Sequence, residues 1–142
     1  MELGLQNKNA LVCGSTQGIG KAAAIGLAYE GVKVTLVARN EAKLKAVIAA
    51  LPNAKLHDYI VADFMDPEGL KSKVEAYIQN NQGFHILINN TGGPKSGAII
   101  DASIDEFSAA FQMHVLVNQI LVQSLVPFMK KQCFGRIINI IS

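Results

Sequence analysis

The sequence predicts an α/β protein with a doubly wound parallel sheet, formed as one domain over residues 1–142. Five short apolar segments alternate along the chain with four segments of helical pattern. The apolar segments are continuous instead of alternating with polar residues, as in strands that helices cover on both faces. Strict alternation of strands and helices is typical of a parallel sheet with right-handed crossovers.

The first part of the chain supplies two expected strands and two expected helices. Residues 10–13 form a short apolar run that ends at a glycine, and residues 18–30 have helical spacing of their apolar side chains. Residues 32–38 are rich in β-branched side chains, which favour a strand. Residues 41–51 are expected to form a helix, because an N-cap asparagine precedes them and a proline follows them.

The middle of the chain repeats this alternation. Residues 56–62 and 85–89 are the third and fourth expected strands. Between them, Asp66 and Pro67 open a helix that we expect to run to about residue 81, because an N-cap acceptor followed by proline is a preferred helix start.

A long helix is expected after residue 103, since Ser103 and Glu106 form a capping-box pattern. We expect Pro127 and the Lys130-Lys131 pair to mark its end. One stripe of this helix carries side chains at helical spacing, namely Phe107, Phe111, Val115, Asn118, Val122 and Val126.

The fifth expected strand, residues 136–141, is apolar on both faces because it holds four isoleucines. An apolar strand at an uncovered sheet edge is an aggregation hazard that natural domains avoid. We therefore expect the natural protein to continue beyond residue 142. The alternative is that a dimer partner covers this strand.

Composition and charge exclude several classes of protein. Half of the residues are hydrophobic and the net charge is +2, which excludes disorder and gives no reason to expect nucleic acid as a partner. An apolar run of about eighteen residues is absent, so we expect no membrane span, and the first ten residues lack a secretory signal. Cys13 and Cys133 are too few for a disulfide framework, and we interpret both as reduced core residues of a cytoplasmic protein. Clusters with metal-ligand spacing are absent as well.

Three glycines, Gly14, Gly18 and Gly20, lie between the first expected strand and the first helix. Gly14 allows a tight turn, Gly18 allows the backbone to approach a phosphate, and Gly20 allows the helix to pack near the strand. A helix N-terminus adds unpaired N–H groups and a positive dipole, so the segment predicts a pyrophosphate-binding turn. The alternative is a tight turn without a ligand. A P-loop is excluded, because five residues separate Gly14 from the Gly20-Lys21 pair where that motif has four.

Four segments together resemble the short-chain dehydrogenase/reductase family. The turn has the spacing of that family's T-G-x-x-x-G-[IL]-G fingerprint, with Cys13 in place of the threonine. Residues 62–64 resemble the family's acidic adenine site, residues 89–93 its N-N-A-G segment, and residues 135–142 the strand that leads to its catalytic serine. The match covers essentially the whole chain and implies a Rossmann-like fold that binds a dinucleotide.

The resemblance assigns the whole turn to the cofactor, namely Gly14, Ser15, Thr16, Gln17, Gly18, Ile19 and Gly20. The second strand ends at Arg39, with no carboxylate beside it. An acidic residue at this place selects NAD, whereas a basic one accommodates the 2′-phosphate of NADP. Arg39, helped by a hydrogen bond from Ser15, therefore favours NADP(H). The alternative is that Arg39 is a solvated residue at the start of the next helix.

Further cofactor residues are implied after the third and fourth strands. By resemblance, Asp63 accepts a hydrogen bond from the adenine amino group and Phe64 contributes its backbone. A helix cap is the alternative role for Asp63, but the next aspartate already supplies it. Asn90 is implied on the ribose side of the cofactor, and Gly92 allows the backbone to come close. Thr91 stands where the family has alanine and adds a hydroxyl without an assigned use.

Two residues are catalytic candidates by resemblance. Ser142 corresponds to the serine that hydrogen-bonds the substrate carbonyl oxygen. His114 stands where the family has an asparagine that holds a water in a proton relay; packing is an equally weighted alternative for it. Tyr29 and Lys33 have the spacing of the family's Tyr-x-x-x-Lys pair, but Gly31 breaks the helix between them. The family's own pair lies about a dozen residues beyond its serine.

The resemblance implies an NADP(H)-dependent oxidoreductase, similar to 3-oxoacyl-carrier-protein reductases, that transfers hydride between nicotinamide and a small-molecule carbonyl or alcohol. The 142 residues lack the Tyr-x-x-x-Lys pair, so we expect them to be inactive alone. A non-catalytic dinucleotide-binding sensor or scaffold is the alternative, and an interaction domain is a weaker one. Because family members often associate through the long helix, which here carries Phe107 and Phe111, a homo-oligomer is expected.

Overall fold

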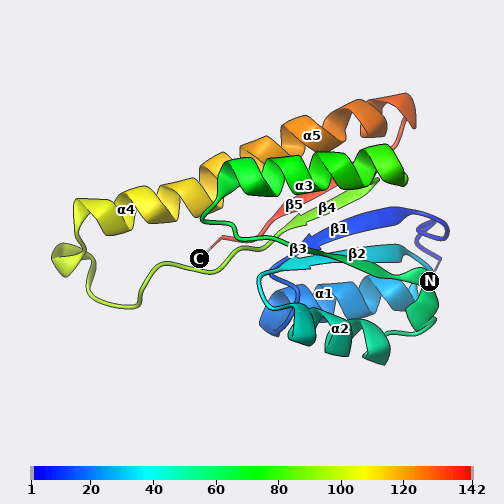
Figure 1. Ribbon diagram of the computed structural model, residues 1–142, viewed down its shortest axis with the longest axis horizontal. Coiled ribbons are helices and arrows are strands. Elements are labelled where there is room, and N and C mark those ends of the chain that lie inside the picture. Colours follow the sequence, from blue (N-terminus) through cyan, green and yellow to red (C-terminus); the bar gives the residue numbers. More distant parts are fainter. Residues whose placement is uncertain (1, 142) are drawn as a thin grey trace.

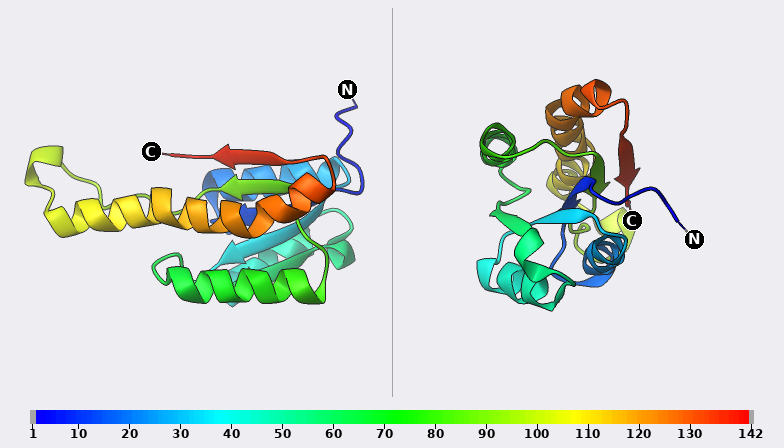
Figure 2. Two further views of the ribbon diagram at one scale, coloured as in Figure 1. Left: turned by 90° about the horizontal axis from the view of Figure 1, so that it is seen from above. Right: turned by 90° about the vertical axis from the view of Figure 1, so that its right-hand side faces the viewer.

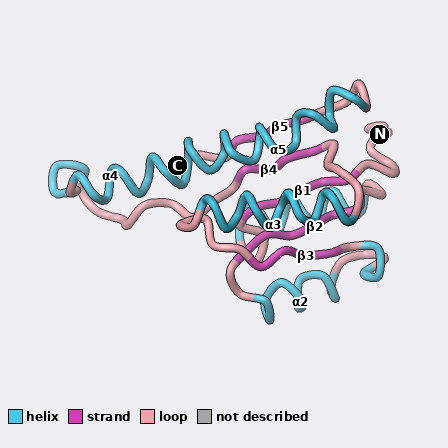
Figure 3. The backbone as a smooth tube through the Cα atoms, turned by 45° about the horizontal axis from the view of Figure 1, so that its top comes forward, coloured by secondary structure: helices cyan, strands magenta, loops and turns pink. Residues whose placement is uncertain are grey.

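A computed structural model describes residues 2–141 as a five-stranded parallel sheet with helices on both faces (Figure 1). The strands are β1 (Asn9–Cys13), β2 (Lys33–Ala38), β3 (Asp58–Val61), β4 (Ile86–Asn89) and β5 (Arg136–Asn139). Their order is β3-β2-β1-β4-β5 (Figure 3). Each neighbouring pair is parallel. The predicted fold class, a doubly wound parallel sheet, is confirmed.

The helices form two layers. They are α1 (Gly18–Tyr29), α2 (Glu41–Ala50), α3 (Pro67–Asn80), α4 (Ile104–Phe111) and α5 (Val117–Lys131), with 3₁₀ turns η1 (Ala54–Leu56) and η2 (Ile99–Asp101) and a π-helical turn η3 (Gln112–Leu116). Helices α1 and α2 cover one face of the sheet, and α3 and α5 cover the other (Figure 2). Helix α4 continues the line of α5 beyond the edge of the sheet (Figure 1).

Strand β1 lies at the centre of the core. Its side chains alternate between two apolar clusters: Leu11 and Cys13 contact the cluster under α3 and α5, whereas Ala10 and Val12 contact the cluster under α1 and α2. All four side chains are fully buried. This double burial is the physical reason why the strand sequences are apolar at every position.

The predicted helix starts are confirmed at the atomic level. The Asn40 side chain accepts a hydrogen bond from the backbone N–H of Lys43 at 2.9 Å, and the Asp66 side chain accepts one from Gly69 at 3.0 Å. Ser103 and Glu106 form the reciprocal capping box, with hydrogen bonds of 3.2 and 2.8 Å. Each cap satisfies N–H groups that a helix start otherwise leaves unpaired.

The long helix differs from the prediction in two ways. It is interrupted by the π-helical turn η3, and Pro127 lies inside α5 instead of at its end; the helix ends at Lys131, as the Lys130-Lys131 pair predicted. A proline inside a helix costs about 3 kcal/mol. The burial of Leu125 and Met129 on either side of Pro127 outweighs this cost and keeps the helix intact to Lys131.

The predicted stripe of the long helix is only partly buried. The buried side chains of α5 are Val117, Asn118, Leu121, Leu125 and Met129. Phe107, Phe111 and Val115 are instead about half exposed, at 50%, 55% and 46%. They leave an apolar face on α4 and η3 that the described part of the chain does not cover.

The two cysteines have different surroundings, so the prediction that both belong to the core is wrong for one of them. Cys13 is fully buried at the end of β1, whereas Cys133 is exposed. Cys133 follows the end of α5 with a φ of 51°, in the left-handed region. Its position is therefore set by the turn that ends the helix rather than by packing.

The long helix formed by α4, η3 and α5 has the length and apolar composition of a membrane span, which the apolar runs of the sequence did not indicate. By length and composition alone, the 28 residues of Ile104–Lys131 are long and apolar enough to cross a bilayer. One side of α5 packs against the sheet, although only 17% of the most apolar part of this helix is buried. The helix is weak evidence for a membrane.

Two histidines connect the amino ends of the strands. The Nδ1 atom of His85 accepts a hydrogen bond from the backbone N–H of Asn9 at 3.0 Å, and that of His57 accepts one from Val34 at 3.0 Å. Both side chains are buried. These two histidines therefore stabilise the contacts between neighbouring strands.

We expect the stability of the protein to depend on the protonation of His85. Burial, with a smaller contribution from the Lys8 charge, lowers the pKa of His85 below its usual value of 6.5. Below about pH 6.5 the unfolded chain therefore binds a proton that the folded chain excludes. The stability that neutral His85 gives the folded protein is complete above about pH 6.5 and is lost as the pH falls toward the folded-state pKa. Protonation also breaks the bond to Asn9, which is worth about 1 kcal/mol.

Urea unfolding between pH 7.5 and 5 measures this dependence. The His85→Gln variant, which cannot titrate at this position, is expected to lose less stability over that range than the wild type. Identical slopes in the two proteins would show that His85 does not contribute to the acid sensitivity.

Candidate functional site

The candidate site lies at the carboxyl ends of β1 and β4. Strand β1 continues into α1 on one face of the sheet, whereas β4 leads to the helices on the opposite face (Figure 1). The strand order reverses between these two neighbours. In open α/β sheets, ligands bind in the crevice that such diverging crossovers create.

Gly14 forms the turn that directly follows β1. Its φ is 58°, and its backbone N–H donates a hydrogen bond to the Val37 carbonyl at 3.0 Å. A Cβ atom at this position would overlap the carbonyl oxygen of Asn90. Gly14 is thus required both by its left-handed backbone and by the close approach of the chain that follows β4.

Gly20 and Gly18 have different roles. A Cβ atom on Gly20 would overlap the Gly14 carbonyl oxygen and lie 2.6 Å from the Nδ2 atom of Asn90, so Gly20 allows close packing. A Cβ atom on Gly18 would meet nothing within 4 Å, although the φ of Gly18 is 55°. The absence of a side chain at Gly18 therefore leaves open space at the start of α1, as its predicted role requires.

The start of α1 offers backbone donors without partners in the helix. The residue before the helix, Gln17, makes no side-chain capping bond, and the first turn contains no acidic residue. The first N–H to bond back within the helix is that of Lys21, at 3.3 Å from the Gln17 carbonyl. The N–H groups of Gly18, Ile19 and Gly20 precede it and are therefore available to an anion.

Ser15 adds a polar atom to the same turn. Its side chain is fully buried, and its Oγ atom has no hydrogen-bond partner within residues 2–141. Buried hydroxyls in native proteins are nearly always paired. Together with the open space at Gly18 and the uncapped helix start, this unpaired hydroxyl fits a turn that binds the phosphates of a dinucleotide. Thr16, Gln17 and Ile19 complete the predicted turn, and the last two are exposed.

Asn90 ties the turn to β4. Its Nδ2 atom donates to the Gly14 carbonyl at 3.2 Å and lies 3.5 Å from the Cys13 carbonyl. The amide that resemblance places beside the cofactor ribose therefore already supports the turn. The Nδ2 atom of Asn89 donates a hydrogen bond to the Oδ1 atom of Asn139 at 2.8 Å, and this bond between side chains joins β4 to β5.

Cys13, which stands where the family fingerprint has threonine, is chemically inert. Burial raises the pKa of its thiol to about 12, and a backbone hydrogen bond from Asn90 lowers that pKa only in part. Because the thiolate is the reactive form of cysteine, Cys13 packs rather than reacts.

The predicted adenosine residues lie at the same edge of the sheet. Arg39 is exposed directly after β2. Asp63 is exposed after β3, and its Oδ1 atom accepts a hydrogen bond from the backbone N–H of Met65 at 2.9 Å. Asp66, not Asp63, caps α3. Phe64 is buried in the core, so only its backbone can face a ligand.

Of the two predicted catalytic residues, the structure describes His114, which lies beside Thr91. Thr91, buried after β4, donates a hydrogen bond from Oγ1 to the Met113 carbonyl at 3.1 Å and lies 3.4 Å from the Nδ1 atom of His114. Gly92 is exposed, with open space around it. Ser142 lies outside the described residues.

The π-helical turn η3 is the feature of the site that sequence reasoning missed. It places His114 and the Met113 carbonyl against Thr91. Single-turn π-bulges occur frequently at functional sites. The sequence signal was limited to the two unusual residues, Thr91 and His114, because helical spacing does not distinguish a π turn from an α turn.

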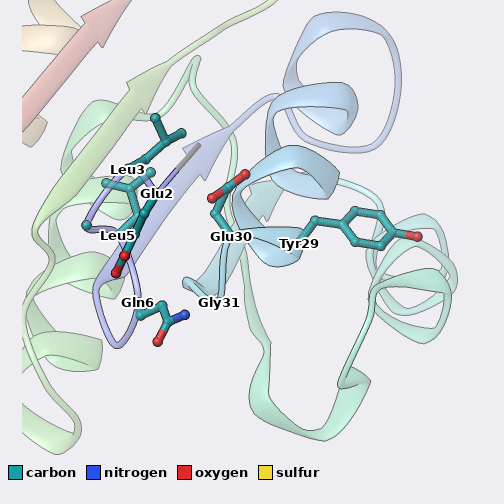
Figure 4. A pocket seen from close by; sticks show the side chains of 8 residues that line it. Glu2, Leu3, Leu5, Gln6, Tyr29, Glu30 and Gly31 are labelled. Atoms are coloured by element: carbon teal, nitrogen blue, oxygen red, sulfur yellow. The ribbon is translucent and has the colours of Figure 1, made fainter.

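The opposite edge of the sheet holds a separate cavity of about 410 Å³. It is lined by residues of the N-terminal segment and the end of α1, including Glu2, Leu3 and Glu30 (Figure 4). Tyr29 also borders it, and Gly31, with a φ of 77°, separates Tyr29 from Lys33. Tyr29 and Lys33 thus lie at the edge of the sheet opposite the glycine turn, which agrees with their exclusion as a catalytic pair.

The sheet, its order and the glycine turn define a class of parallel α/β proteins with a glycine-rich first crossover. The profile of the short chain dehydrogenase family matches residues 8–142. The chain therefore belongs to this family, as the sequence motifs predicted.

Relatives and solved structures agree with this assignment. An uncharacterized oxidoreductase of Staphylococcus aureus (strain MW2) is 33% identical over 138 residues, which is 97% of this chain and 59% of the relative. L-sorbose reductase from Gluconobacter frateurii, solved with NADPH and L-sorbose, has a TM-score of 0.86 at 31% identity, over 96% of this chain and 53% of that protein. YwfH, an NADPH-dependent reductase involved in bacilysin biosynthesis, has a TM-score of 0.85 at 25% identity, over 95% and 54%. The chain thus spans between half and three-fifths of the length of these proteins.

Proposed function

We propose that the carboxyl edge of the sheet binds a nicotinamide dinucleotide, with NADP(H) preferred over NAD(H), and that the protein is an oxidoreductase acting on a small carbonyl or alcohol compound. The observation that carries this proposal is the glycine turn. It combines three uncapped N–H groups, open space at Gly18 and the buried, unpaired hydroxyl of Ser15. These features suit the paired phosphates of a dinucleotide.

The preference for NADP(H) rests on Arg39. This guanidinium is exposed at the end of β2, and no acidic residue lies beside it in the sequence to bind the ribose hydroxyls of NAD. A guanidinium forms strong, charge-assisted bonds with phosphate. The NADPH-bound sorbose reductase and the NADPH-dependent YwfH support the same preference by likeness of fold and sequence.

The bound nicotinamide would supply the hydride or accept it. The protein's own residues would bind and orient the cofactor through the turn, Arg39 and Asp63, with Asn90 holding the turn in place. By resemblance, Ser142 would donate a hydrogen bond to the substrate oxygen, where charge develops in the transition state.

The exposed apolar face of α4 and η3 supports the expectation of a homo-oligomer. Phe107, Phe111 and Val115 lie about half exposed along one side of the helix. We propose that a second copy of the chain covers this face.

Substitution of Arg39 tests the cofactor preference. In the complete protein, Arg39→Ala is expected to weaken NADPH binding by about tenfold to a hundredfold, because hydrogen bonds to charged groups are worth about 1.5–3 kcal/mol. NADH binding should change little, since NADH lacks the 2′-phosphate. Isothermal titration calorimetry with both cofactors measures the two affinities.

Lys55→Ala is the matched control, because Lys55 is an exposed base in η1, at the amino edge of β3. It should leave both affinities unchanged. Tighter binding of NADH than of NADPH by the wild type, unaffected by Arg39→Ala, would contradict the proposed preference.

A further inference from the structure

Thr91 and His114 are two departures from the family pattern, and the structure brings them into contact. Thr91 follows β4 and is 9% exposed, and His114 lies in the π-helical turn η3. The Oγ1 atom of Thr91 lies 3.1 Å from the Met113 carbonyl oxygen and 3.4 Å from the Nδ1 atom of His114. One hydroxyl thus faces two partners at once.

The chemistry of these atoms assigns the protons. A hydroxyl has a single proton to donate, and a carbonyl oxygen can only accept. The Thr91 hydroxyl therefore donates its proton in the shorter contact, to the Met113 carbonyl oxygen. The lone pairs of Thr91 Oγ1 remain for His114, so the Nδ1 atom of His114 must carry a proton to complete the second hydrogen bond.

The other ring nitrogen of His114 is then an acceptor. Its Nε2 atom is buried and has no hydrogen-bond partner within residues 2–141. The Oδ1 atom of Asn118, one turn further along the helix, is likewise buried without a partner in that range. Buried polar atoms in native proteins are nearly always paired, so two such acceptors four residues apart on the same helix indicate that a hydrogen-bond donor binds on this side of it.

We propose that Thr91 is a positioning residue for His114, whose hydroxyl holds the neutral imidazole as the Nδ1–H tautomer and leaves Nε2 free as a hydrogen-bond acceptor beside the carboxyl edge of the sheet. Which nitrogen of a histidine carries the proton is set by the bond that the other nitrogen makes. The tautomer does not depend on the identity of the cofactor. Only a role of the His114 Nε2 atom in proton transfer to or from a substrate rests on the proposed function.

Long-range ¹H–¹⁵N correlation spectra of the complete protein test this assignment. They are recorded without cofactor near pH 8, well above the usual histidine pKa of about 6.5. The signals of His114 are identified by their loss in the His114→Gln variant, which separates them from those of His57 and His85. Three further proteins are compared: Thr91→Ser keeps the hydroxyl, Thr91→Val removes it at nearly the same shape, and Thr91→Ala removes it with less bulk.

The wild type and Thr91→Ser are expected to show His114 mainly as the Nδ1–H tautomer. Thr91→Val should shift the majority to the Nε2–H form, which a free neutral imidazole prefers. If Thr91→Val does not fold, Thr91→Ala takes its place in the comparison. A wild type with mainly Nε2–H, or a hydroxyl-free variant that retains Nδ1–H, overturns the proposal. Because no dinucleotide is present, either result leaves the proposed function untouched.

Discussion

Replacing Gly14 with alanine is expected to destabilise the protein by about 2–5 kcal/mol. Its left-handed φ of 58° costs an L-residue about 1–2 kcal/mol. The new Cβ atom would also overlap the carbonyl oxygen of Asn90, and overpacking of this kind costs about 1–3 kcal/mol. Such a loss is a large fraction of the 5–15 kcal/mol that typically stabilises a folded protein. Urea unfolding of the complete protein measures the change.

Gly26→Ala is the matched control for this substitution. Gly26 lies inside α1, and a Cβ atom there would meet nothing within 4 Å. Alanine is favoured over glycine inside a helix by about 1 kcal/mol, so Gly26→Ala should stabilise the protein. If Gly14→Ala unfolds at the same urea concentration as the wild type, the close approach of the turn to Asn90 is not a constraint on the fold.

Replacing Gly18 with alanine is expected to weaken dinucleotide binding at least about tenfold, with a loss of about 1–2 kcal/mol of stability from the left-handed backbone. The added Cβ atom meets no protein atom within 4 Å and enters the open space at the start of α1 where a phosphate would bind. Loss of one hydrogen bond to a charged phosphate costs about 1.5–3 kcal/mol. Calorimetric titration with NADPH gives the affinity, and urea unfolding gives the stability of the same sample.

Gly4→Ala separates backbone strain from the loss of the site. Gly4 has a similar left-handed φ of 64° and open space around it, but it lies in the N-terminal segment before β1. Both variants should lose about 1–2 kcal/mol of stability through the backbone conformation. Only Gly18→Ala should lose affinity, and equal affinities in the two variants would argue against a phosphate at Gly18.

Much of the architecture could be predicted because it follows from local signals. The caps at Asn40, Asp66 and Ser103 each depend on a side chain and a backbone N–H three residues later, so sequence spacing alone identifies them. The continuous apolar strands likewise follow from burial on both faces. The glycine turn was predictable for the same reason, since positive φ and close approach both require glycine.

The long helix was less predictable, because its details depend on distant contacts. Pro127 is a reliable stop signal locally, but the packing of Leu125 and Met129 on the sheet overrides it. The π-helical turn η3 accepts a hydrogen bond at its Met113 carbonyl from Thr91, which lies 22 residues away in the sequence. Helical periodicity therefore predicted a single stripe through Phe107, Phe111 and Val115, whereas the structure leaves these side chains half exposed.

A crystal structure of the complete protein with NADPH tests the account most directly. We predict that the pyrophosphate accepts hydrogen bonds from N–H groups of residues 18–20, that the Ser15 hydroxyl gains a partner, and that Arg39 contacts the 2′-phosphate. A dinucleotide bound elsewhere, with the turn unoccupied and the Ser15 hydroxyl still unpaired, would contradict it.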